Sequence, residues 1–281
     1  MLRPLPELPE LKIIETNSLK PHEQIEQGRV EPIVRGLQSD GILKNPPLVM
    51  RLHTQADEYL VLDGANRTMA FNSLDIPHAL VQLVRPGVET VRLRTWNRVV
   101  FAADPRALFD RLDAQTEITP APRDRIEQLE RIAAGMRLAY LYLPDGSAWE
   151  LGREREALDD RMEHLGALIE ACIETGKTDR TSEMDVAGLS GVYEGLAGVL
   201  VFPSIEVEEV IEAAIEDIVL PAGLTRFIVS PRALRVNYPL GLLAEEKSLA
   251  QKQTALEAWI QKRVQEQAVR YYAEATIVFD E

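Results

Sequence analysis

The chain has 281 residues, of which 46% are hydrophobic, so it is long for one domain and able to build a sizeable core. Its formal net charge of −14 argues against broad nucleic-acid binding, which needs many Lys and Arg side chains to neutralise phosphates. The sequence has no apolar run long enough to cross a membrane, and its first residues lack an apolar signal core. The single cysteine, Cys172, cannot form an intramolecular disulfide. These features predict a cytoplasmic protein of two domains without membrane contact.

The first hundred residues alternate between strand and helix patterns, which predicts a compact α/β domain over residues 1–103. An amphipathic helix is expected at 29–39, where Val30, Ile33, Val34 and Leu37 recur at helical spacing and Gly41 follows as a stop signal. A second helix is expected at 65–74, and both helices should pack on a small mixed sheet. The strands of that sheet are expected at 11–15, 48–52, 58–62, 79–84 and 91–96.

Beyond residue 103 the pattern changes, and residues 104–281 are expected to form a second, mostly helical α+β domain. The polar stretch 177–191 predicts a loop. Helices are expected at 105–113, 122–136, 154–175, 205–218 and 241–270. Strands are expected at 138–143, 148–151, 199–202, 226–229, 234–237 and 275–279.

A short polar segment, Asp63-Gly64-Ala65-Asn66-Arg67-Thr68, stands between a predicted strand and a predicted helix. A strand that turns through glycine into a helix leaves the first helical N–H groups free to bind an anion, which the helix dipole also favours. Arg67 adds a guanidinium suited to phosphate oxygens, and Thr68 can add a hydroxyl. The segment therefore predicts a phosphate-binding turn, and the alternative is a capped helix with a surface arginine.

Three segments of the N-terminal region, 19–23, 41–49 and 63–67, resemble the ParB/sulfiredoxin superfamily. Within that superfamily the chain is most similar to the free L-serine kinases, which convert L-serine to O-phospho-L-serine with ATP or ADP as donor. Trp96 matches a tryptophan that follows the last strand in that family. The resemblance continues into the second domain at 202–203, 208–214, 221–227 and 232–240.

The residue after Gly64 separates the chain from two other groups of the superfamily. Sulfiredoxin has its catalytic cysteine at the position of Ala65, and ParB proteins carry Gly-Glu-Arg-Arg where this chain has Gly64-Ala65-Asn66-Arg67. Ala65 also departs from the kinases, which usually have His or Asn there. We therefore expect an altered phosphate-binding turn in which the backbone N–H groups are retained.

The resemblance implies that the turn from Asp63 to Thr68, together with Lys44 and Asn45, binds the nucleotide phosphates. Asp63 is expected to orient the turn or to hold a metal-bound water, with Mg²⁺ as the cofactor. The carboxylate that accepts the serine hydroxyl proton is expected to be Glu23 or Glu26. We prefer Glu23 as the base, with Glu26 as ligand of the substrate ammonium or alternate base. Their spacing places both on one face if the segment is helical.

Four further residues are candidates for the substrate side of the active-site cleft, which the second domain is expected to complete. His22 could bind phosphate or fix its loop, and Trp96 could flank the substrate or belong to the core. Thr225 and Arg226 could reach a carboxylate or phosphate, or Arg226 could pair with the Glu-rich helix near 206–216.

Two other functions are also compatible with the sequence. The first is a regulatory module in which a nucleotide acts as a switch and the second domain binds DNA or a protein. The second is a nuclease, which is the weaker alternative because the sequence shows no dense cluster of metal ligands. The oligomeric state is not determined by these patterns, and a homodimer is possible.

Overall fold

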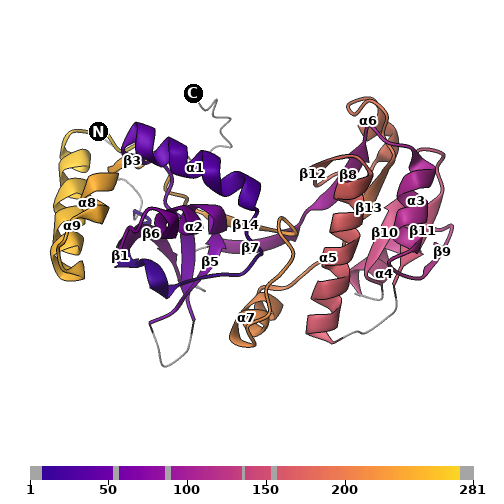
Figure 1. The fold of residues 1–281 in the computed structure, drawn as a ribbon, viewed down its shortest axis with the longest axis horizontal. Helices are drawn as coiled ribbons and strands as arrows, with labels where there is room; N and C mark the ends of the chain where they lie inside the picture. The colour runs from indigo at the N-terminus through magenta and orange to yellow at the C-terminus, as the bar shows by residue number, and fades with distance from the viewer. Residues whose placement is uncertain (1–7, 53–56, 86–89, 135–136, 153–156, 273–281) are drawn as a thin grey trace. The chain divides into compact units, whose positions relative to one another are not determined.

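The computed structural model describes residues 8–52, 57–85, 90–134, 137–152 and 157–272, and its contacts divide the chain into two compact units (Figure 1). Unit 1 combines residues 1–20, 27–90 and 230–281, whereas unit 2 combines 21–26 and 91–229. The expected division near residue 103 would give two consecutive domains. Both units are instead discontinuous, because the C-terminal part of the chain packs with the N-terminal part.

Unit 1 is built on a five-stranded sheet with the strand order β1-β6-β4-β5-β2. Strand β6 pairs antiparallel with β1 and parallel with β4, so the sheet is mixed, as the sequence predicts. The central strands are apolar and buried on both faces. The strands are β1 (Glu10–Glu15), β2 (Leu19–Pro21), β4 (Leu48–Arg51), β5 (Tyr59–Asp63) and β6 (His78–Val84).

The predicted strand at 91–96 does not join this sheet. It forms β7 (Thr90–Thr95), which pairs with β14 (Thr225–Ser230) in a separate two-stranded sheet. The expectation of one sheet over residues 10–97 is therefore wrong for its last strand, because the pairing partner lies far away in the sequence.

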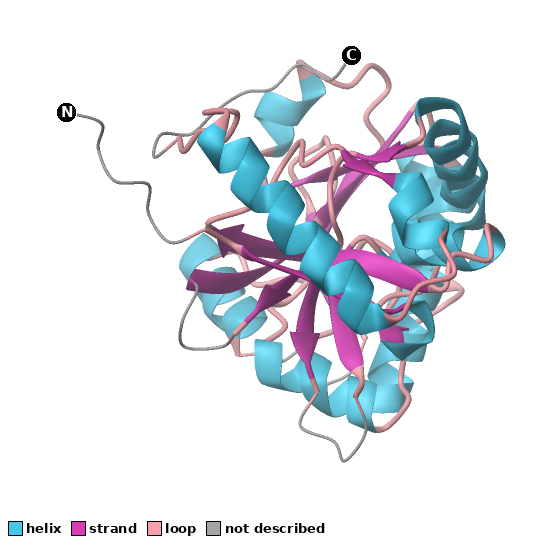
Figure 2. Cartoon of the chain, turned by 90° about the vertical axis from the view of Figure 1, so that its left-hand side faces the viewer, coloured by secondary structure: helices cyan, strands magenta, loops and turns pink. Residues whose placement is uncertain are grey.

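The described residues of unit 1 include four α-helices. The two predicted from the sequence, α1 (Gln27–Asp40) and α2 (Ala65–Ser73), contact each other. The helix expected at 241–270 is divided into α8 (Leu240–Ala244) and α9 (Leu249–Gln265), because Ser248 and Gln251 form a capping box that starts α9 anew. Helix α9 contacts β1, and α8 contacts β6. Figure 2 shows the chain from the side on which α8 and α9 lie in Figure 1.

The strand expected at 234–237 is absent. Arg235 and Asn237 have φ angles of 50° and 54°, in the left-handed region that regular strands do not use. The chain instead forms the short strand β15 (Tyr238–Pro239), which pairs with β3 (Ile42–Leu43). The strand expected at 275–279 lies outside the described residues.

Unit 2 has a six-stranded sheet at its centre, with the order β12-β8-β13-β10-β11-β9. All of its neighbouring strands are antiparallel, which agrees with the α+β expectation. Its strands are β8 (Asn97–Phe101), β9 (Ile118–Pro120), β10 (Ala139–Tyr142), β11 (Ala148–Leu151), β12 (Lys177–Thr181) and β13 (Gly198–Val201). Its helices are α3 (Pro105–Asp113), α4 (Arg125–Ala133), α5 (Leu158–Thr175), α6 (Val186–Ser190) and α7 (Val207–Ile215).

Both faces of this sheet are covered, and successive side chains of its central strands point alternately to one face and to the other. Tyr140 and Tyr142 of β10 belong to an apolar cluster that includes Ile132 of α4 and Leu189 of α6. Leu141, between the two tyrosines, faces the other side, where α3 and α5 pack together. The prediction of a loop at 177–191 is wrong, because this stretch contains β12 and α6. Strand β12 lies at the edge of the sheet, and its mostly polar side chains lack the apolar pattern by which a strand is predicted.

No helix in the described part of the chain is both long and apolar enough to span a membrane.

A buried carboxylate stabilises unit 2, and its loss is expected to destabilise the fold. Glu150 of β11 is 3% exposed and accepts hydrogen bonds from Arg131 (2.7 Å), Arg137 (2.8 Å) and Tyr140 (3.0 Å). Glu150→Gln leaves two guanidiniums without their counter-ion, so the free energy of unfolding should fall by about 1–3 kcal/mol. The shift of the urea midpoint measures this loss.

The matched control is Glu174→Gln, which removes an exposed ion pair with Arg111. Exposed pairs contribute about 0–1 kcal/mol, so this midpoint should move much less. Equal shifts in the two variants would contradict the stabilising role of Glu150.

Candidate active site

The N-terminus of α2 has the geometry expected of an anion-binding turn. Gly64 precedes the helix with a φ of 101°, a conformation that favours glycine. The first helical hydrogen bond runs from the Thr68 N–H to the Gly64 carbonyl at 3.0 Å, so the backbone hydrogen bonds of the helix begin at Thr68. A Cβ on Gly64 would lie 2.8 Å from Nη2 of Arg67, whose guanidinium folds over the turn.

Two arginines share the carboxylate that ends β5. Oδ2 of Asp63 accepts hydrogen bonds from Nη2 of Arg67 at 2.8 Å and from Nη2 of Arg232 at 2.5 Å. Partial burial raises the pKa of the Asp63 carboxyl, but the two guanidiniums outweigh it and hold the pKa below its usual range. Burial and the charge of Arg232 lower the pKa of Arg67, which stays a cation because arginine is not deprotonated in proteins. The cluster therefore carries one negative and two positive charges.

The predicted residues Lys44 and Asn45 lie against the segment that carries Arg232. The Lys44 carbonyl accepts a hydrogen bond from the Val236 N–H at 2.7 Å, and Oδ1 of Asn45 accepts one from the Arg235 N–H at 2.9 Å. The Lys44 ammonium forms an ion pair with Asp40 at 2.9 Å. Sequence reasoning placed Arg232 in a family signature but gave it no role, because it is separated from Asp63 by much of the chain.

The first turn of α2 contains Ala65, Asn66 and Thr68, the other three residues of the predicted phosphate-binding turn. Thr68 is buried, and its hydroxyl donates to the Ala65 carbonyl at 2.7 Å. That hydroxyl therefore closes the turn, and its proton is not available to a phosphate.

Asp63 fits poorly as a direct ligand of Mg²⁺, because two guanidiniums occupy one of its oxygens and repel a cation. Among the described residues there is no group of three or more acidic, His or Cys side chains able to hold a metal ion. Mg²⁺ in phosphotransfer sites is usually bound by one or two carboxylates together with phosphates and waters.

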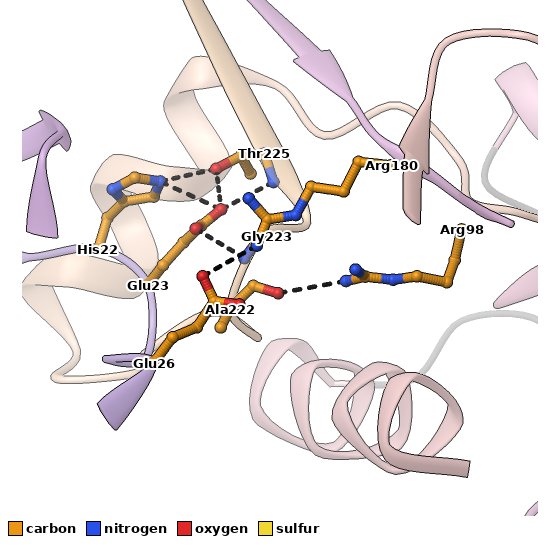
Figure 3. A network of polar contacts seen from close by, with 8 residues as sticks. All are labelled: His22, Glu23, Glu26, Arg98, Arg180, Ala222, Gly223 and Thr225. Atoms are coloured by element: carbon orange, nitrogen blue, oxygen red, sulfur yellow. Dashed lines mark hydrogen bonds and ion pairs between the residues drawn. The ribbon is translucent and has the colours of Figure 1, made fainter. Parts of the chain in front are cut away.

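In unit 2, the segment from Pro21 to Glu26 extends alongside the residues before β14, so the helical geometry considered for Glu23 and Glu26 is wrong. Glu23 and Leu220 form a parallel β-bridge. The Leu220 N–H donates to the His22 carbonyl at 2.9 Å, and the Gln24 N–H donates to the Leu220 carbonyl at 2.8 Å. This pairing brings Glu23 to the Gly223–Thr225 turn (Figure 3).

Both oxygens of the Glu23 carboxylate accept hydrogen bonds. Oε1 accepts from the Thr225 N–H at 2.7 Å and from the Thr225 hydroxyl, and Oε2 accepts from the Gly223 N–H at 2.8 Å. Burial raises the pKa of the Glu23 carboxyl, but the hydrogen bond and charge of His22 and the Thr225 bonds outweigh burial. The net pKa lies below the usual value of a glutamate, so Glu23 is ionised at neutral pH.

His22 is buried and extends the same chain of hydrogen bonds. Its Nε2 lies 2.7 Å from the Thr225 hydroxyl, and its ring contacts Phe227 edge-on. Because the Thr225 hydroxyl gives its single proton to Glu23, Nε2 of His22 must carry the proton of the His22–Thr225 bond. His22 therefore fixes the orientation of Thr225 and Glu23.

Glu26 is held by an arginine that sequence reasoning did not identify. Oε2 of Glu26 lies 3.0 Å from Nη2 of Arg180, which comes from β12 (Figure 3). The guanidinium of Arg180 passes over Gly223, whose φ is 68°, and a Cβ there would overlap with it. A second arginine, Arg98, is 6% exposed and donates to the Ala222 carbonyl at 3.5 Å. Glycine at 223 thus makes room for the arginine that positions Glu26.

Thr225 and Arg226 were predicted as a pair but point to opposite faces, because successive side chains of a strand alternate. Thr225 is buried and faces Glu23, whereas Arg226 is exposed and lies over the Trp96 ring, 4.5 Å from its centroid. The Trp96 backbone N–H donates to the Leu224 carbonyl at 2.8 Å. The structure therefore groups Thr225 with His22 and Glu23, and Arg226 with Trp96.

No protein-family model matches this chain. It is 31% identical over 84 residues to an ATP-dependent L-serine kinase of Staphylothermus marinus, and the aligned residues make up 30% of this chain and 33% of that protein. It is 24% identical over 248 residues to the ATP-dependent L-serine kinase SbnI of Staphylococcus aureus, and this alignment covers 86% of this chain and 87% of that protein. The first similarity thus spans a third of its relative, and the second spans most of both chains.

The fold is that of a solved free serine kinase. A structure of that kinase in complex with ADP has a TM-score of 0.71, with 20% identity, and covers 85% of this chain and 96% of the other. The likeness at this level of identity concerns the fold.

Proposed function

We propose that this protein is a kinase that transfers a phosphoryl group from ATP or ADP to the hydroxyl of free L-serine. The observation that carries this proposal is the similarity to the ATP-dependent L-serine kinase SbnI, which extends over 248 residues and 86% of the chain. The fold of a free serine kinase, solved with ADP, supports a nucleotide as the donor.

In this proposal unit 1 binds the phosphates of the donor. The N–H groups at the start of α2 and the guanidinium of Arg67 present donors and positive charge on one side of the turn. These groups stabilise the charge that spreads over the transferred phosphoryl group. Mg²⁺ is the expected cofactor and would neutralise further phosphate charge, but the surroundings of Asp63 do not favour it as a direct ligand. The strand–turn–helix at Asp63–Thr68 also supports a ParB/sulfiredoxin-like fold for unit 1.

In unit 2, Glu23 is proposed as the base. The serine hydroxyl oxygen forms a bond to the terminal phosphorus, the bond from phosphorus to the bridging oxygen breaks, and Glu23 accepts the hydroxyl proton. The transition state of phosphoryl transfer is loose in most analyses, so the base must be ionised and well placed, and it need not be strong. The lowered pKa of Glu23 and its fixed carboxylate meet both requirements. Oε2 accepts one described hydrogen bond, which leaves it a lone pair for the substrate.

The substrate contacts follow from the charges around the site. Glu26 is proposed to bind the ammonium of L-serine, with its carboxylate oriented by Arg180. Arg226 and Trp96 are proposed to line the substrate side, where an exposed guanidinium on an aromatic face can bind a carboxylate. His22 holds Thr225 and Glu23 in place.

The test is incubation of the purified protein with L-serine and Mg²⁺ together with ATP, ADP or CTP, followed by detection of O-phospho-L-serine. We expect phosphoserine with ATP or ADP, and none when D-serine or L-alanine replaces L-serine. Hydrolysis of CTP that DNA stimulates, without phosphoserine, would instead identify a regulatory nucleotide-binding module and refute the kinase proposal.

A further inference from the structure

We propose that Arg232 is a second phosphate-binding side chain of the donor site and that Gln82 is the residue that positions it. This inference depends on the proposed function only in identifying the bound anion as a nucleotide phosphate. Three features of unit 1 support it. The buried side-chain amide of Gln82 binds the loop that contains Arg232, residues 44–45 bind the same loop further on, and positive charge is in excess beside α2.

Gln82 is a polar residue in the middle of the apolar central strand β6, and it is 1% exposed. Its Nε2 donates to the Pro231 carbonyl at 2.9 Å, and its Oε1 accepts from the Ala233 N–H at 2.8 Å. The amide therefore binds the backbone on both sides of Arg232. A buried amide is costly unless both its ends are satisfied, and here the partners are the two neighbours of one arginine.

A second pair of contacts fixes the same loop three residues further on. The backbone N–H groups of Arg235 and Val236 donate to Oδ1 of Asn45 and to the Lys44 carbonyl. With Gln82 at one end and residues 44–45 at the other, the loop has little freedom. Arg232 is consequently held with Nη2 at 2.5 Å from Asp63, next to the first turn of α2.

Asp63 is surrounded by more positive charge than is needed to neutralise its carboxylate. One guanidinium would neutralise Asp63, but Arg67 and Arg232 both contact the same Oδ2. The Nε atoms of both arginines are buried and have no hydrogen-bond partner in the described part of the structure. Two like charges beside the positive end of α2 repel each other, and an anion bound there relieves this repulsion. Both side chains remain about a fifth exposed, at 23% and 22%, so a ligand can reach them.

Asp63 therefore acts as the shared counter-ion that holds the two guanidiniums side by side. Guanidinium forks match the oxygens of phosphate groups, and two of them suit the adjacent phosphates of a nucleoside di- or triphosphate.

The experiment measures binding of ADP and of inorganic pyrophosphate to the full chain by calorimetry, with and without Mg²⁺. Arg232→Ala should weaken both ligands about ten- to a hundredfold, as expected for the loss of charge-assisted hydrogen bonds. Arg232→Lys should give an intermediate loss, because lysine keeps the charge without the planar fork. Arg85→Ala is the control, since Arg85 is an exposed residue of the same unit that pairs with Glu10, and its affinities should equal those of the wild type.

A double-mutant cycle tests the role of Gln82. Gln82→Met removes both hydrogen bonds at similar length and should weaken pyrophosphate binding about tenfold in the wild-type background but hardly at all in Arg232→Ala. Circular dichroism and the melting temperature check that each variant folds. An additive loss would overturn the positioning role, because it would show that Gln82 does not act through Arg232.

The remaining outcomes are also decisive. Unchanged pyrophosphate affinity in folded Arg232→Ala would overturn the role of Arg232, as would a wild type that binds neither ligand. A wild type that binds ADP through Arg232 but forms no phosphoserine would refute the proposed function and leave this inference standing.

Discussion

Glu23→Gln is expected to lower the turnover number for phosphoserine formation by about 10²–10⁴-fold, the usual contribution of a general base. Glutamine keeps the size of the side chain, and its one carbonyl oxygen can still accept the hydrogen bond from the Thr225 N–H, whereas its NH₂ group cannot accept the bond from the Gly223 N–H. It cannot take the serine proton. The affinity for nucleotide should be unchanged, because the residues proposed to bind the phosphates belong to unit 1. Steady-state kinetics and ADP calorimetry on the same preparation give both quantities.

The control for this variant is Glu26→Gln. If Glu26 binds the substrate ammonium, this change should raise the KM for serine more than it lowers the turnover number. A loss of turnover in Glu26→Gln with near-normal turnover in Glu23→Gln would show that the two roles are reversed. If neither variant has an effect, the kinase proposal itself fails.

The pH profile provides a second readout for Glu23. Its pKa is held below the usual value of a glutamate, so the carboxylate stays ionised as the pH falls through that value. The acid limb that Glu23 imposes on kcat/KM should therefore lie below about pH 4.3, the ordinary glutamate pKa. The same sign applies to stability: this contribution is present above the unfolded-state pKa and is lost as the pH falls through the folded-state pKa.

Arg67→Ala is expected to weaken ADP binding by about 1–3 kcal/mol, the scale of a lost charge-assisted hydrogen bond to an ionised group. The reason is that its guanidinium lies over Gly64, at the start of α2, where the helix N–H groups also point. Asp63 keeps Arg232 as a counter-ion in this variant, so the fold should be retained. Calorimetry with ADP measures the loss, and the melting temperature without ligand checks the fold.

The control for Arg67 is Arg51→Ala, which removes an exposed arginine of the same unit that pairs with Asp57. Its ADP affinity should match that of the wild type. If Arg67→Ala binds ADP as tightly as this control does, the guanidinium does not contact the phosphates, and the turn at Gly64 is only a helix start.

Local sequence patterns were sufficient to predict those helices and turns whose capping residues and glycines lie within a few residues of one another. Helix α3 occupies the predicted range 105–113, because Asp104 caps it and Pro105 starts it. The strand–glycine–helix pattern predicted the turn at Gly64, since its left-handed φ follows from the residue type. The sequence also singled out Glu23, but only through the family resemblance and with a helical geometry that the structure replaces with an extended one.

The tertiary structure decided every relation between residues that are distant in the sequence. The hydrogen bonds from Gly223 and Thr225 to Glu23, and the ion pair of Asp63 with Arg232, join segments that no local period connects. The opposite directions of Thr225 and Arg226 became definite only when β14 paired with β7, since the alternation of a strand requires the strand to exist. Local propensity fixes backbone conformation over a few residues, whereas strand pairing and burial select which distant segments meet, and both candidate clusters, at Asp63 and at Glu23, depend on that selection.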